Sequence, residues 1–194
     1  LIAIPFYLSN YQVTFINSLF EAFSGITGTG FSVFENIKYL DPTLILWRSS
    51  SQWIGGMYFL FFLILIFSNK QFNYKLTDLT YSGDGNINTE DNIKNLLLKI
   101  FIFYSILSFL IFLSLNFTKV RMFNSLNLSM SLISAGGFLP TDSLDQIIKS
   151  NFQKIVFILS LLISMLNFFL ILNIFQKKII IREHKEDLYL LLLI

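Results

Sequence analysis

Two short uncharged segments, residues 27–31 and 134–138, contain the residues best suited to bind a ligand. The first reads Thr-Gly-Thr-Gly-Phe and the second Ser-Ala-Gly-Gly-Phe. Glycine and other small residues let a chain bend so that carbonyl oxygens turn inward and replace the water around a cation. Because neither segment is charged, backbone dipoles and hydroxyls would do the binding, which suits a large monovalent cation. We expect ion-binding residues at Thr27, Gly28, Thr29, Gly30, Ser134, Ala135, Gly136 and Gly137.

Other common chemistries have few residues available. The chain of 194 residues contains no cysteine and one histidine, His184. This composition excludes disulfides, thiolate metal sites and thiol nucleophiles, and it leaves little room for a catalytic triad. The formal net charge of +2 is small and spread out, so no basic stripe for nucleic acid is present.

The composition is that of a membrane protein. Hydrophobic residues make up 54% of the chain and charged residues 13%, whereas about one quarter of a soluble domain is charged. A helix needs about 20 apolar residues to cross a bilayer. Three segments reach that length, residues 44–67, 93–115 and 152–175, and we expect each to be a transmembrane helix.

Each glycine segment follows a short apolar stretch, residues 15–26 and 122–133. Stretches of 10 to 14 apolar residues are typical of helices that enter the membrane and return. Non-helical backbone at membrane depth is tolerated only where protein buries it or where it lines a water-filled path. The pattern therefore predicts two re-entrant loops around a pore or cavity, with ordinary Gly-rich turns as the plainer alternative.

An internal repeat supports the pore loops. A shift of 107 residues aligns residues 17–31 with 124–138 without a gap, and seven of the fifteen positions are identical. The same shift superposes residues 44–67 on 151–174. The sequence thus predicts four segments. They are the end of an outer helix with the pore loop and inner helix of repeat 1 (1–67), a cytoplasmic loop (68–92), repeat 2 (93–175), and a cytoplasmic linker with the start of repeat 3 (176–194).

Several stretches resemble the Trk/Ktr/HKT superfamily of potassium transporters, and they are closest to its TrkH branch. Residues 20–30 (FEAFSGITGTG) are similar to its first pore loop, residues 47–57 (WRSSSQWIGGM) to the following helix, residues 134–138 to its second pore loop, and residues 182–190 to the charged linker before the third repeat. This resemblance implies four units around one pore, with Gly30 and Gly137 as filter glycines. The family usually has Thr at the positions of Gly28 and Ala135.

The resemblance also implies which atoms hold the ion. Potassium would be bound as the transported ion, with no cofactor, by the backbone carbonyl oxygens of Thr27, Gly28, Thr29, Ser134, Ala135 and Gly136. The expected fold is an all-α membrane protein of repeated helix, re-entrant pore loop and helix units, forming part of a pseudo-fourfold, potassium-channel-like pore. The expected partners are the lipid bilayer, a second copy in a homodimer, and a cytosolic nucleotide-binding regulatory subunit. No enzymatic activity and no nucleic-acid partner are expected.

The basic residues indicate an orientation in a bacterial inner membrane crossed several times. Loops on one side hold eight Lys and Arg residues, and those on the opposite side hold five. Because cytoplasmic loops carry the excess of positive charge, we expect the glycine segments near the outer face. Both chain ends cut apolar runs that are too short to span the bilayer, which predicts a fragment of a longer protein.

Three polar residues lie inside otherwise apolar stretches. Glu21, whose counterpart in the repeat is Leu128, could tune the cation field, accept hydrogen bonds behind the filter, or only cap the loop. Arg48 and Gln52 lie one helical turn apart and share a face. We expect Arg48 to brace the loop or extend to the interface rather than to contact the ion, because its charge would repel potassium.

The predicted function is potassium uptake through a carbonyl-lined filter. Two alternatives stay open. One is a sodium-conducting or sodium-coupled member of the same superfamily. The other is a polytopic membrane protein without a pore, such as a membrane enzyme or an assembly factor.

Overall fold

The computed structural model describes residues 1–67 and 90–165, and these contain helices and loops but no strand. The predicted linker 176–194, most of the predicted loop 68–92 and the end of the predicted segment 152–175 lie outside the described residues. The helices, in chain order, are α1 (Ile4–Tyr7), α2 (Phe15–Thr27), the 3₁₀ helix η1 (Ile37–Tyr39), α3 (Pro42–Phe67), α5 (Glu90–Phe117), α6 (Met122–Ile133), the 3₁₀ helix η2 (Leu144–Gln146) and α7 (Asn151–Met165).

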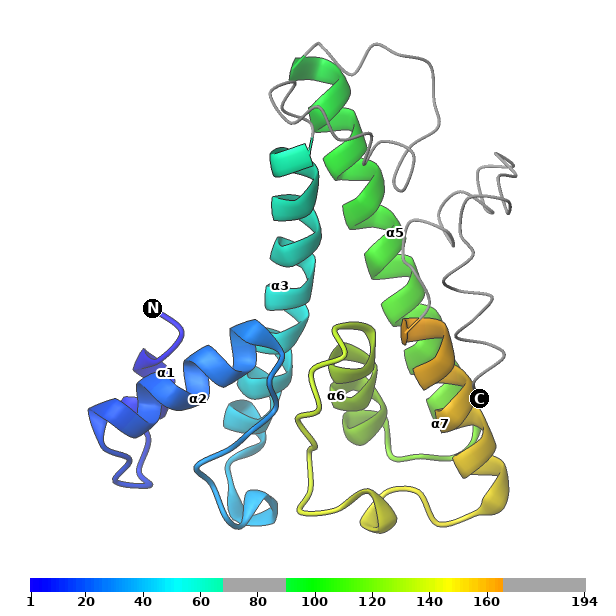
Figure 1. The fold of residues 1–194 in the computed structure, drawn as a ribbon. Helices are drawn as coiled ribbons and strands as arrows, with labels where there is room; N and C mark the ends of the chain where they lie inside the picture. The colour runs from blue at the N-terminus through cyan, green and yellow to red at the C-terminus, as the bar shows by residue number, and fades with distance from the viewer. Residues whose placement is uncertain (68–89, 166–194) are drawn as a thin grey trace.

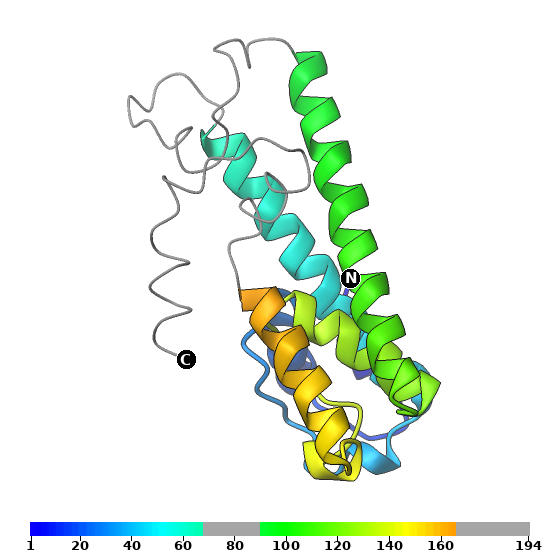
Figure 2. The same ribbon diagram turned by 90° about the vertical axis from the view of Figure 1, so that its right-hand side faces the viewer.

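Two long antiparallel helices, α3 and α5, form the frame of the molecule, and the short helices α2 and α6 reach only part of the way along them (Figure 1). Helix α3 packs against α2 on one side and α6 on the other. Helix α7 runs beside α5 and α6 (Figure 2). The predicted short helices are confirmed, since α6 has the predicted bounds and α2 is one residue longer.

One helix in the described residues, Lys94–Phe117 within α5, is long and apolar enough by length and composition to cross a membrane. Helix α3 has 26 residues, which corresponds to about 39 Å at the usual helical rise. The described part of α7 is a shorter apolar helix. The predicted segments 44–67 and 93–115 therefore form continuous helices, each beginning two or three residues before its predicted start.

Helix α3 places polar side chains inside and apolar side chains outside. Its first half buries a group of polar residues, Arg48, Ser49, Ser51 and Gln52. Tyr58, Phe59 and Phe62 in its second half are more than half exposed. Polar residues buried within an otherwise apolar helix are costly unless they have partners, so this face points to contacts that the molecule needs.

The backbone repeats with the period found in the sequence. Among the described residues, positive φ angles occur at six positions, which form three pairs separated by 107 residues: Gln12 with Lys119, Gly28 with Ala135, and Gly30 with Gly137. The helices η1 and η2 are related by the same shift. Because positive φ is uncommon outside glycine, the three pairs show that unusual backbone conformations recur at the spacing of 107 residues found in the sequence.

Candidate ion-coordination site

The first glycine strand, residues 28–31, begins where α2 ends. Thr14 caps the start of α2 by accepting a hydrogen bond from the N–H of Asn17 at 3.3 Å. Gly28 adopts the left-handed conformation, with φ +67°, and ends the helix. Its N–H donates to the carbonyl of Gly25 at 3.1 Å, and the N–H of Thr29 donates to Ser24 at 3.0 Å. The chain then turns back along α2.

The second glycine strand, residues 135–138, leaves α6 with the same hydrogen bonds. The N–H of Ala135 donates to the carbonyl of Leu132 at 3.0 Å, and that of Gly136 donates to Ser131 at 2.8 Å. These four residues are the counterparts, 107 residues later, of those in the first loop. Ala135 adopts φ +51° although it carries a side chain. The two loops therefore share one backbone design.

The two strands meet backbone to backbone. A Cβ atom built on Gly30 would overlap the carbonyl oxygen of Gly136, and one built on Gly137 would lie 3.8 Å from the Cα of Gly30. A Cβ at Gly28 would lie 3.5 Å from the carbonyl oxygen of Ser134. Residues more than 100 positions apart are thus brought together, and side chains at Gly30 would prevent this approach.

All eight predicted ion-binding residues lie in this pair of loops, and several are open to the outside. Exposed positions are Thr27, Thr29, Ala135 and Gly137, and Gly136 is buried. The hydroxyls of Thr27 and Thr29 lie 2.6 Å apart and share a hydrogen bond. Carbonyl and hydroxyl oxygens are therefore the groups that this surface offers to a ligand. No cluster of three or more His, Cys, Asp or Glu residues suited to a metal occurs in the described part of the chain.

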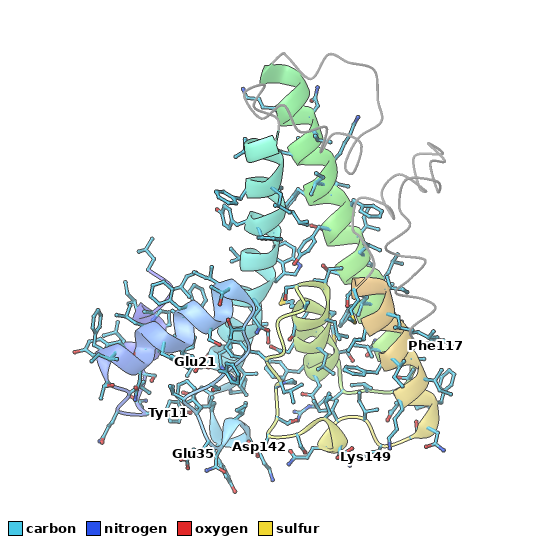
Figure 3. All side chains as sticks on the ribbon, in the orientation of Figure 1. Tyr11, Glu21, Glu35, Phe117, Asp142 and Lys149 are labelled. Atoms are coloured by element: carbon cyan, nitrogen blue, oxygen red, sulfur yellow. The ribbon has the colours of Figure 1, made fainter. Side chains whose placement is uncertain are left out.

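Glu21 and Arg48 form an ion pair behind the first strand. Nε of Arg48 donates to Oε1 of Glu21 at 2.7 Å, and both side chains are almost completely buried. The carboxylate also accepts from the hydroxyl of Ser32 at 3.1 Å and from the N–H of Val33 at 2.9 Å. Figure 3 labels Glu21 on α2, and the ion pair joins this helix to α3. Of the alternatives left open, hydrogen bonding behind the strand is the role that the structure supports.

Arg48 also contacts the second loop. Its guanidinium carbon lies 4.2 Å from the centre of the Phe138 ring, and Nη1 donates to the carbonyl of Leu139 at 3.4 Å. Nη2 is buried and has no hydrogen-bond partner among the described residues. A cation over an aromatic face is attracted by the ring, more so when water is excluded. The expectation that Arg48 braces a loop is confirmed, and it braces both.

Gln52 contacts the second strand on either side of Gly137. Its Nε2 donates to the carbonyl oxygen of Gly136 at 2.5 Å, and its Oε1 accepts from the N–H of Phe138 at 3.1 Å. The sequence predicts that Gln52 and Arg48 lie on the same face of one helix. It does not predict these two hydrogen bonds, which join residues 84 and 86 positions apart. One feature of the sequence pointed to a special role for Arg48 and Gln52. They are polar, whereas the equivalent residues of repeat 2, Ile155 and Leu159, are apolar.

Known proteins resemble this chain in sequence. The family model TrkH, described as "Cation transport protein", matches residues 2–194. An uncharacterized cation transporter of Methanocaldococcus jannaschii is 30% identical over 146 residues, covering 70% of this chain and 28% of that protein. The Trk system potassium uptake protein TrkI of Halomonas elongata is 38% identical over 55 residues, which cover 28% of this chain and 11% of that protein.

The fold also matches a solved structure. The potassium transporter TrkH from Vibrio parahaemolyticus has a TM-score of 0.76 and 22% sequence identity, and the match covers 90% of this chain and 35% of that one. The chain therefore spans about a third or less of these relatives. The all-α membrane fold is that of TrkH. Since the family model covers nearly every residue, the chain belongs to the TrkH family of cation transport proteins.

Proposed function

We propose that this chain forms two pore loops of a potassium-uptake protein, in which potassium crosses the bacterial inner membrane down its electrochemical gradient. The proposed ligands are the backbone carbonyl oxygens of residues 27–29, 134 and 135, with one filter glycine from each repeat. The carbonyl oxygen of Gly136, which the sequence also predicts as a ligand, accepts a hydrogen bond from the buried amide of Gln52 and is therefore not proposed as one. The observation that carries the proposal is the contact between Gly30 and Gly137, which have equal φ angles and end equivalent loops.

The chemistry of the two strands supports a monovalent cation. The strands bear no charge, so an ion would be held by dipoles alone, and such sites replace a hydration shell without binding too tightly for release. The nearest cationic group, Arg48, is neutralised by Glu21 and covered by Phe138. Its charge is therefore kept away from the open side of the strands, where it would repel a cation.

Uptake of radioactive rubidium, with and without competing sodium, tests this function. The complete protein should be reconstituted into lipid vesicles, and rubidium uptake should be driven by an inside-negative potential. Uptake that potassium blocks and sodium does not block supports the proposal. Equal competition by sodium would assign the protein to sodium-conducting members of the superfamily, and the absence of any uptake would overturn a pore.

The assembly is also a proposal. The family resemblance implies a homodimer in the membrane with a cytosolic nucleotide-binding regulatory subunit, and the name of one relative, Trk system potassium uptake protein, fits a system of several components. The repeat boundaries at residues 67 and 93 would place residues 68–92 and the linker after residue 175 on the cytoplasmic side. Mass measurement of the purified complex in detergent, with and without the cytosolic subunit, tests both the stoichiometry and the partner.

A further inference from the structure

We propose that Gln52 is a positioning residue for ion selection: from the inner helix of repeat 1 it holds the glycine strand of repeat 2 in the conformation that faces the ion. This inference rests on the proposed function, because it assigns a role in selectivity to a residue that touches no ion. Its basis is a pair of hydrogen bonds that cross between the repeats.

The side-chain amide of Gln52 acts as a partner strand would. It donates to the carbonyl oxygen of Gly136 and accepts from the N–H of Phe138, so both backbone groups that flank Gly137 are paired by one side chain. Gln52 is completely buried. A Cβ on Gly136 would overlap its amide carbon. This close fit leaves the strand little freedom to shift or rotate.

The second strand needs such a partner. Gly137 has φ +80° and is exposed. Neighbouring side chains therefore do little to restrict the backbone conformation at this glycine. Gly136 and Phe138 are buried, and a buried N–H or C=O group without a hydrogen bond is strongly unfavourable. Without the Gln52 amide, the peptide groups beside Gly137 would have to turn toward water in the pore.

The support is asymmetric between the repeats. In repeat 1 the strand is bonded to α2 of the same repeat, because the hydroxyl of Ser24 donates to the carbonyl of Phe31 at 2.5 Å. In repeat 2 the strand is held from α3 of the preceding repeat. The counterpart of Gln52 on α7 is Leu159, which is 53% exposed. Gln52 is thus a specific addition to α3 rather than part of the repeated design.

Helix α3 therefore sets the relative position of both strands. Arg48, one turn before Gln52, is paired with Glu21 behind the first strand and donates to Leu139 beyond the second. Any shift of α3 would move the two strands together. In a filter of backbone carbonyl groups, the arrangement of those groups decides which ion is preferred, and the Gln52 contacts fix the second strand relative to α3.

The test uses the complete protein in lipid vesicles and measures the ratio of rubidium to sodium uptake. Gln52→Met keeps the length and shape of the side chain and removes both hydrogen bonds. Gln52→Glu keeps an acceptor for Phe138 and removes the donor to Gly136. The matched control is Ser49→Ala, because Ser49 is also buried on α3 but, among the residues that the structure describes, its hydroxyl bonds only the helix carbonyl of Ile45.

We expect Gln52→Met to lower the rubidium-to-sodium ratio by about tenfold, the factor that corresponds to about 1.4 kcal/mol, while total cation uptake per folded protein persists. Gln52→Glu should lower the ratio less, and Ser49→Ala should leave it unchanged. A purely structural role would reduce the amount of folded protein without altering the ratio. Should Gln52→Met fail to accumulate in the membrane, the uptake ratio of Gln52→Glu is compared with that of the wild-type protein instead.

Two results would overturn the inference, and they differ from one another. If the wild-type protein is selective and both Gln52 variants keep its uptake ratio, the positioning role is wrong and the proposed function stands. If the wild-type protein takes up neither rubidium nor potassium, the proposed function fails and the inference fails with it.

Discussion

Gly30 and Gly137 lie against one another at equivalent positions of two repeats, with φ angles of +79° and +80°. A Cβ added to Gly137 would lie 3.8 Å from the Cα of Gly30. The pair shows that the glycine strands converge on one place, as four such strands would around a common axis. Both positions have a positive φ angle, which favours glycine. At Gly30 the close approach adds a second reason, because a Cβ there would overlap the carbonyl oxygen of Gly136.

Gly30→Ala is expected to abolish selective uptake. Alanine would have to adopt a left-handed conformation, which costs about 1–2 kcal/mol, and its Cβ would overlap the carbonyl oxygen of Gly136. The strands would therefore separate. Rubidium uptake by vesicles containing the complete protein should fall by about tenfold or more, since about 1.4 kcal/mol corresponds to a factor of ten.

Gly28→Ala is the matched control for that variant. Gly28 also has a positive φ angle, but its Cβ would make ordinary contacts of 3.5 and 3.7 Å. Ala135 already occupies the equivalent position with φ +51°. Because the cost of the left-handed conformation is shared by both variants, we expect a smaller loss of uptake from Gly28→Ala than from Gly30→Ala, and an equal loss in both variants would contradict the argument from the strand contact.

Removing one partner of the ion pair between Glu21 and Arg48 should be severely destabilising. Arg48→Met would leave the carboxylate buried without its countercharge, and such changes cost about 3–5 kcal/mol. Glu21→Leu would leave the guanidinium in the same state. Thermal unfolding of the purified protein, followed by the loss of monodisperse protein on heating, measures the effect.

The double variant Glu21→Leu with Arg48→Ile should be more stable than either single variant. It installs the residues that repeat 2 has at the equivalent positions, Leu128 and Ile155. With both charges removed, the remaining cost is the loss of partners for the O–H of Ser32, the N–H of Val33 and the carbonyl of Leu139. Additive losses in the double variant would show that the two side chains do not stabilise each other.

Gly55→Ala should prevent the normal packing of α3 on the end of α2. A Cβ at Gly55 would overlap the carbonyl oxygen of Ile26 and lie 2.7 Å from its carbonyl carbon, and backbone atoms cannot move aside as a flexible side chain can. Close helix packing through small residues is common in membranes. We expect a large loss of folded protein on fluorescence-detected size exclusion, whereas Ser50→Ala on the same helix should behave like the wild type.

Gln153→Ala should reduce stability without changing selectivity. Its Oε1 accepts from the N–H groups of Lys149 and Ser150 at 2.8 and 3.1 Å, and its Nε2 donates to the carbonyl of Thr118 at 3.0 Å. These bonds tie the start of α7 to the turn after α5, away from the glycine strands. Loss of such capping contacts costs about 1–2 kcal/mol. A lower unfolding temperature with an unchanged rubidium-to-sodium ratio is the expected result.

The repeated plan of this protein can be recognised in its amino-acid sequence. Apolar length predicted α3 and α5, and the shorter apolar runs predicted α2 and α6 to within one residue at each end. The shift of 107 residues identifies Gly30 and Gly137 as equivalent positions. These features are local or periodic, so they are encoded in residue type and spacing along the chain.

The partners of the buried polar residues, in contrast, follow from the packing of the folded chain. Glu21, Arg48 and Gln52 were recognisable as polar residues in apolar surroundings, but their spacing could not show that Arg48 lies between two loops or that Gln52 bonds the strand of the other repeat. These contacts join residues 27 to 91 positions apart. Their partners are mostly backbone groups, which every residue possesses, and packing alone selects among them.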